Sequence, residues 1–235
     1  MWIERLAFEW FKGKLHVKIL VLAGFGDSMF AFRGELLRAM VQMGHEVHAA
    51  APGLRDSRSF SELLAAGVLS HDTSMNRAGV NPFSDLAYMF RISLLAMRQK
   101  PTVCLSYTVK PVVYGTLAAW VARVPGRYAL VTGLGYAFGG NRVGLVPFVV
   151  RSLYRFALSK ATKVFFQNPN DERQFREMGL MPTNTPSVVV NGSGVDIDAY
   201  GECPVLPGVP VFLMIARLLG DKGVREYAQA ARRVR

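Results

Sequence analysis

Short runs of branched apolar residues recur along this chain, and segments with helical periodicity separate them. The first run, residues 17–23, has the composition of a strand buried on both faces of a parallel sheet. A glycine loop follows, then a helical pattern over residues 32–43 and a second apolar run at 45–51. This order predicts a right-handed strand–helix–strand unit.

The same alternation continues to residue 190. Further strands are predicted at 102–106, 128–132, 163–167 and 187–190, and helices at 60–66, 81–99, 113–124, 145–160 and 171–178. Strands and helices that alternate at these lengths predict an α/β fold with a doubly wound, mostly parallel, Rossmann-like sheet. Ligands of such sheets bind beyond the carboxyl ends of the strands.

The alternation of strand and helix patterns ends before residue 198. Residues 198–210 contain three prolines and no clear period, which is typical of a linker. Residues 211–215 then predict a new buried strand, with a helix beginning before residue 235. The sequence therefore predicts an N-terminal extension (1–16), a first domain (17–197), a linker (198–210) and the start of a second domain (211–235).

Composition narrows the class of protein. Hydrophobic residues make up 51% of the chain and charged residues 19%, which excludes a disordered protein. The net charge of +11 is spread without a long basic run, so it favours anionic lipid or phosphorylated substrates over nucleic acid. Cys104 and Cys203 form neither a disulfide framework nor a metal motif, so we expect a cytoplasmic protein.

The N-terminal extension, residues 1–16, mixes tryptophan and phenylalanine with charged residues. Its apolar run is interrupted too often to form a signal peptide or a membrane span. It is therefore either an amphipathic helix on a membrane surface, a helix docked on its own domain, or an upstream extension from a misassigned start.

Glycines follow the first predicted strand at Gly24 and Gly26. Glycine lets a backbone approach a ligand closely, and the helix N-terminus beyond it favours an anion. Met29 stands where the dinucleotide-binding fingerprint needs a third glycine, so that fingerprint fails. A ligand-binding loop and a simple tight turn both remain open.

Two further loops are candidate ligand contacts. Residues 132–140 combine glycines with two aromatic residues, which suits stacking on a sugar or packing against an acyl chain. Lys110 follows another strand and either contacts substrate or solvates its loop. The four histidines show no metal-ligand spacing; His45 and His48 are expected to be partly exposed strand-edge residues without a role.

Arg217 and Lys222 flank the loop after the strand predicted at 211–215. Two cations beside helix N–H donors form a plausible diphosphate site. The alternative is a buried ion pair between Arg217 and Asp221.

The motifs Asn191-Gly-x-Gly194-Val-Asp196 and Ala-Arg217-Leu-Leu-x-x-Lys222-Gly, in this order after the glycine loop at 24–26, resemble those of family 4 glycosyltransferases of the GT-B fold. The resemblance covers residues 17–235. It is greatest to bacterial enzymes that build polysaccharides or lipid-linked oligosaccharides.

This resemblance implies a retaining transfer of a sugar from a nucleotide donor, usually UDP-linked, to a saccharide or lipid-linked acceptor, without a metal or other cofactor. Arg217 and Lys222 would hold the donor diphosphate and stabilise the charge of the leaving group. The remaining matched positions are Gly24 and Gly26 near the donor, Thr132, Gly133 and Gly135 on the acceptor side of the cleft with Lys110 beside them, and Asn191, Gly194 and Asp196 at the interdomain hinge.

The chain departs from the family pattern in two places. Several members have a histidine where Thr132 and Gly133 stand, and the family's Glu-x7-Glu motif and nucleoside-binding loops would lie beyond Arg235. We therefore expect a chain that lacks most of the C-terminal domain, works at the inner face of the cytoplasmic membrane and shows little or no transfer by itself; its catalytic residues are not identified. The alternative is a non-catalytic or split-enzyme subunit whose donor-binding half is a separate polypeptide.

Overall fold

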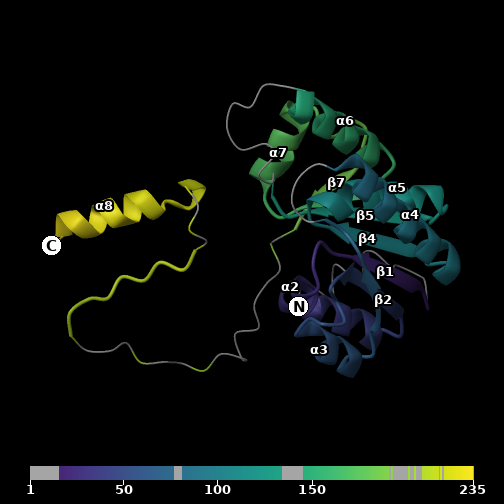
Figure 1. Ribbon diagram of the computed structural model, residues 1–235, viewed down its shortest axis with the longest axis horizontal. Coiled ribbons are helices and arrows are strands. Elements are labelled where there is room, and N and C mark those ends of the chain that lie inside the picture. Colours follow the sequence, from purple (N-terminus) through teal and green to yellow (C-terminus); the bar gives the residue numbers. More distant parts are fainter. Residues whose placement is uncertain are drawn as a thin grey trace. The chain divides into compact units, whose positions relative to one another are not determined.

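The computed structural model describes residues 16–76, 81–133, 145–190, 192, 201, 204, 208–216, 218 and 220–234 (Figure 1). The chain divides into two compact units, the first ending at Gly194 and the second beginning at Val195. Each unit is described by itself.

The first unit is built on a parallel sheet of seven strands in the order β3-β2-β1-β4-β5-β6-β7. The strands are β1 (Lys18–Leu22), β2 (Glu46–Pro52), β3 (Leu69–Thr73), β4 (Val103–Tyr107), β5 (Gly126–Val131), β6 (Lys163–Phe166) and β7 (Ser187–Val189). The connecting helices are α2 (Asp27–Gln42), α3 (Ser59–Ala65), α4 (Pro82–Gln99), the π-helical turn η1 (Pro111–Gly115), α5 (Thr116–Val121), α6 (Leu145–Ser159) and α7 (Pro169–Glu177).

The helices bury both faces of this sheet. Alternate side chains of β1 point to opposite faces, so Ile19 packs in the same cluster as Leu37 of α2, whereas Leu20 packs with Ile92 of α4. Helix α3 joins the first face through Leu63, and α6 and α7 cover the second face over β5 and β6. The predicted doubly wound α/β fold is confirmed.

Two local differences bear on the site. Helix α2 begins at Asp27, five residues before the predicted start, so the glycine loop is a short turn. Strand β3 was not predicted: its sequence, Leu-Ser-His-Asp-Thr, is largely polar because β3 is the edge of the sheet and has no continuous apolar face.

The second unit contains the 3-10 turn η4 (Gly220–Lys222) and helix α8 (Val224–Val234). The buried strand predicted at 211–215 is wrong: these residues form no strand, and Val211 is 90% exposed and Phe212 74%. A strand needs neighbours for its ladder hydrogen bonds, and the described residues provide none here. The segment is tied to α8 by the Tyr227 hydroxyl, which donates a hydrogen bond to the Phe212 carbonyl at 2.7 Å. Among the described helices, none combines the length and apolar character that a transmembrane segment requires.

Candidate functional site

The chain leaves neighbouring strands β1 and β4 in opposite directions, toward β2 and toward β5. In sheets of this type, ligands bind at the carboxyl ends of the strands where the order reverses. Gly24 follows β1 and Thr108 follows β4, so this point of the sheet brings the two residues together.

The contact between Gly24 and Thr108 leaves no room for a side chain at residue 24. A Cβ on Gly24 would lie 2.5 Å from Thr108 Oγ1. Thr108 adopts a φ of 67°, a left-handed conformation that is costly for a β-branched residue. Its hydroxyl is buried and has no hydrogen-bond partner among the described residues. Strain and an unsatisfied hydroxyl at one point mark this turn as a functional candidate.

Gly26 is required by packing within the domain. A Cβ there would lie 2.8 Å from the Gly53 carbonyl oxygen and 2.9 Å from Leu54 Cα, both in the loop after β2. The Gly26 amide also donates to the Pro52 carbonyl at 3.0 Å. Close approach of two backbone segments therefore explains this glycine, and its predicted place near the donor stays a prediction.

A buried cation lies behind the same turn. The guanidinium carbon of Arg33, on α2, lies 5.2 Å from the centroid of the Tyr107 ring at the end of β4. Burial lowers the pKa of Arg33, and the interaction with Tyr107 opposes this shift. The Tyr107 hydroxyl is 3.3 Å from Ser28 Oγ. This cluster fixes the start of α2 against β4.

Lys110 is held by α4. Its Nζ lies 2.6 Å from Asp85 Oδ1, and both side chains are largely buried. Asp85 also interacts with Tyr114, whose pKa is raised by burial and then by this carboxylate. Lys110 therefore does not solvate its loop, and its predicted contact with substrate stays a prediction.

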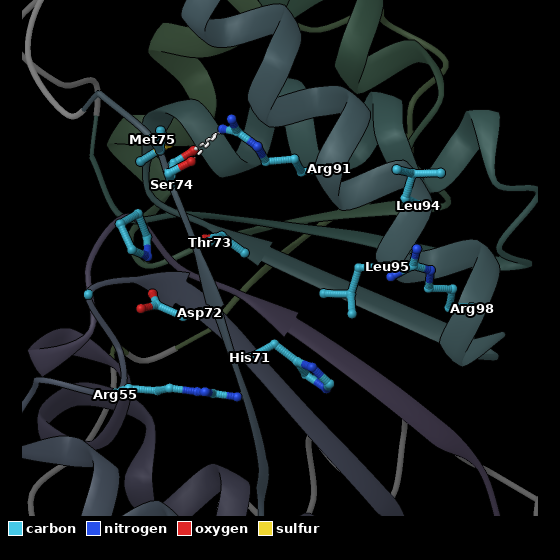
Figure 2. Close-up of a pocket in the computed structure, with 12 residues that line it drawn as sticks. Arg55, His71, Asp72, Thr73, Ser74, Met75, Arg91, Leu94, Leu95 and Arg98 are labelled. Carbon is cyan, nitrogen blue, oxygen red and sulfur yellow. Dashed lines mark hydrogen bonds between the residues drawn. The ribbon is translucent and has the colours of Figure 1, made fainter.

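A surface cleft of about 880 Å³ lies between α4 and the β2–β3 side of the sheet (Figure 2). Its charged lining consists of Arg55 from the loop after β2, Arg91 and Arg98 from α4, and Asp72 from β3. Asp72 Oδ1 accepts the backbone N–H of Leu54 at 3.2 Å, which holds the loop that carries Arg55. The cleft therefore has a positive lining.

Histidines connect this cleft to the interior of the sheet. His71, in the cleft lining, has its Nε2 2.8 Å from His48 Nδ1, and His48 Nε2 lies 2.8 Å from Glu46 Oε1. Glu46 in turn pairs with Lys18 at 2.8 Å. His48 is 2% exposed and His45 6%, so the prediction that both are partly exposed edge residues is wrong: both are buried.

Burial, followed by the charges of His48 and Arg55, lowers the pKa of His71. Hydrogen bonds from Lys18 and His48 lower the pKa of Glu46. If both rings are neutral and Glu46 accepts from His48, then His48 Nδ1 is an acceptor and His71 Nε2 is the donor. The hydrogen bonds that run from Glu46 through His48 fix the orientation of the His71 ring in the cleft.

Sequence reasoning missed this cleft. One signal was available: Arg91 and Arg98 are seven residues apart on a predicted helix and therefore share a face. Arg55 and His71 come from other elements, and only the fold brings them to the same place. Within the described residues, no group of three or more histidine, cysteine or acidic side chains is placed to hold a metal ion.

The model of the glycosyl transferase 4-like domain matches residues 31–192, which include all strands of the sheet except β1. The chain belongs to this glycosyltransferase family. The resemblance to family 4 glycosyltransferases is thereby confirmed.

A curated relative of this chain is the N,N'-diacetylbacillosaminyl-diphospho-undecaprenol alpha-1,3-N-acetylgalactosaminyltransferase of Campylobacter jejuni. The two sequences are 28% identical over 230 residues, which cover 92% of this chain and 60% of the relative. The chain thus spans less than two thirds of that protein.

Solved structures of the same fold include a glycosyltransferase from Rickettsia africae, with 19% identity and a TM-score of 0.56 over 78% of this chain and 44% of that one. Another is Anabaena Alr3699/HepE in complex with UDP and glucose, with 16% identity and a TM-score of 0.53 over 80% of this chain and 47% of that one. These likenesses identify the first unit as the Rossmann-like domain of a GT-B fold.

The structure places only part of the site predicted for this chain. Thr132 is exposed after β5, and Gly133 has a φ of 133°. Lys222 is exposed at the end of η4. The other predicted residues lie outside the described part of the chain: Gly135, Asn191, Gly194, Asp196 and Arg217.

Proposed function

We propose that this domain serves the transfer of a sugar, with retention, from a nucleotide-linked donor to a lipid-linked acceptor. The observation that carries the proposal is the family match over residues 31–192. The Campylobacter relative is, by its name, a transferase that acts on a diphospho-undecaprenol-linked sugar. We extend this acceptor class to the present chain.

In this proposal the first unit binds the acceptor, and Gly24, Gly26 and Thr108 border the site of transfer at the reversal of strand order. Arg217 and Lys222 hold the diphosphate of a UDP-sugar donor, and no metal takes part. The assignments of Gly24, Gly26, Arg217 and Lys222 follow the family resemblance at matched positions, and Thr108 is added because it contacts Gly24. They are supported by the strained Thr108 turn at the place where ligands bind in doubly wound sheets.

The test is a transfer assay with UDP-N-acetylhexosamines and a polyprenyl-diphosphate-linked saccharide, together with equilibrium binding of that acceptor. We expect the 235-residue chain to bind the acceptor and to show little turnover by itself. Turnover that appears only when a second polypeptide is added would support the split-enzyme alternative. Absence of acceptor binding by the folded chain would contradict the proposal.

We also infer that the protein meets its acceptor at the inner face of the cytoplasmic membrane, as a peripheral protein. Support comes from an exposed apolar row on α4, in which Phe83, Leu86 and Phe90 follow one another at helical spacing. The net charge of +11 favours an anionic lipid surface. The N-terminal extension, residues 1–16, is the other candidate membrane contact; all of it but His16 lies outside the described residues.

A further inference from the structure

The cleft beside β3 gathers guanidinium groups from two separate elements. Figure 2 shows Arg91 and Arg98 projecting from α4, while Arg55 and His71 belong to the strand side. Within the part of the chain that the structure describes, neither Arg55 nor Arg98 has a hydrogen-bond or ion-pair partner. The Asp72 carboxylate is engaged with the Leu54 amide. Unpaired arginines around one cavity match the geometry of phosphate oxygens.

Other polar groups that line the cleft are also suited to an anion. One is a hydroxyl without a partner, and others are side chains that hydrogen bonds hold in place. The Thr73 hydroxyl, in the cleft lining, is buried without a hydrogen-bond partner among the described residues. Arg91 Nη1 is held in place by the Ser74 carbonyl at 3.3 Å and by the Ser74 hydroxyl. The His71 ring is oriented by its hydrogen bond to His48, so its Nδ1 donates to an anion once the ring is protonated. A pre-oriented donor such as the Arg91 guanidinium lowers the entropic cost of binding.

The cleft also has an apolar side, formed by Met75, Leu94 and Leu95. A free inorganic ion would make no use of this surface. A phosphorylated ligand with a hydrocarbon part would place its phosphates against the arginines and its carbon chain against these residues.

From this juxtaposition we propose that the cleft lined by Arg55, Arg91, Arg98 and His71 binds a diphosphate group that is esterified to an apolar chain. The anion site stands on the cleft residues alone. The assignment of its diphosphate to a lipid-linked acceptor rests on the proposed function.

The test is calorimetric titration of the 235-residue chain with inorganic pyrophosphate, with farnesyl diphosphate below its micelle concentration, and with UDP. We expect farnesyl diphosphate to bind more tightly than pyrophosphate. Arg55→Gln and Arg98→Gln should each weaken both ligands about tenfold, because each removes a charge-assisted hydrogen bond. Arg173→Gln is the matched control: Arg173 is exposed on α7, and α7 packs beside β6 and β7 at the opposite edge of the sheet.

Leu95→Ser separates the two sources of diphosphate. It should weaken farnesyl diphosphate several-fold and leave pyrophosphate unchanged, because only the former uses the apolar side. Two results together would overturn the lipid assignment. They are weaker UDP binding in the Arg55 and Arg98 variants, and an affinity for farnesyl diphosphate no higher than that for pyrophosphate. The site itself would be overturned if Arg55→Gln and Arg98→Gln bound diphosphates as tightly as Arg173→Gln while their unfolding temperatures were preserved. The assay needs no sugar transfer, so its outcome is separate from that of the proposed reaction.

Discussion

Lys110 Nζ lies 2.6 Å from Asp85 Oδ1, and this buried ion pair ties the turn after β4 to helix α4. The pair holds two elements that border different parts of the site: the switch point beside Thr108 and the wall of the arginine-lined cleft. Removing one partner would leave the other charge buried without its counter-ion, which costs far more than losing an exposed pair.

Asp85→Asn should lower the free energy of unfolding by about 3 kcal/mol in urea denaturation, because the Lys110 ammonium stays buried. The matched control is Glu35→Gln in the exposed Glu35–Arg38 pair of α2, where we expect less than about 1 kcal/mol. Equal losses in the two variants would contradict the structural role. If Lys110→Met weakens the free energy of acceptor binding by more than it lowers the free energy of unfolding, the predicted substrate contact is supported.

Gly24→Ala should destabilise the protein by about 1–3 kcal/mol, because its Cβ would lie 2.5 Å from Thr108 Oγ1. Thr108→Ala removes that hydroxyl, so the double variant should recover much of the loss in thermal unfolding. Gly201→Ala, which has nothing within 4 Å of its Cβ, serves as the control. A double variant as unstable as Gly24→Ala alone would show that the Thr108 hydroxyl is not the obstacle.

The pKa of His71 lies below its ordinary value of 6.5, chiefly because of burial. The unfolded chain therefore binds more protons at this residue than the folded chain, and stability should fall as pH decreases through 6.5 toward the folded pKa. The charged and titratable groups around the His71 ring are His48 on β2, Asp72 on β3, Arg55 in the loop after β2, and Arg91 and Arg98 on α4.

His71→Gln should flatten this pH dependence when unfolding is measured between about pH 7.5 and 5. His45 contributes a slope of the same sign, since burial lowers its pKa as well, and His45→Gln measures that part separately. In an NMR titration of the imidazole, pyrophosphate should raise the pKa of His71. A pKa that does not move at saturating pyrophosphate would place the anion away from this ring.

The apolar row on α4 should support binding to anionic lipid. Phe83→Ser combined with Phe90→Ser should lower the vesicle-bound fraction about tenfold in cosedimentation, because both rings are more than half exposed. Leu64→Ser is the control, as Leu64 is 66% exposed on α3, which covers the other face of the sheet. Equal binding of both variants would assign membrane contact to another part of the chain.

Much of this fold was predictable because its central strands are buried on both faces. Residues such as Ile19 and Leu20 serve opposite faces, so the whole segment is apolar and easily recognised. Strand β3 escaped prediction because an edge strand needs no such pattern. The segment at 211–215 has the apolar pattern of a central strand but lacks neighbouring strands in the described structure. Its composition therefore led to the wrong prediction of a buried strand.

The site was less predictable for a different reason. Glycine at 24 suggested a ligand, but the sequence could not show that Thr108, 84 residues later, occupies the space. The same holds for Lys110 and Asp85, whose pairing depends on how α4 crosses the sheet. The sequence motifs identified the family, whereas the cleft arises from side chains that only the topology assembles.

The line from Lys18 through Glu46 and His48 to His71 crosses three adjacent strands by side chains, in addition to the backbone ladder. We expect a proton gained at His71 to act through His48 and Glu46 on the ion pair with Lys18 of β1. Ligand binding in the cleft should then change the stability of β1, and amide hydrogen exchange in β1 would report on a ligand that never touches it.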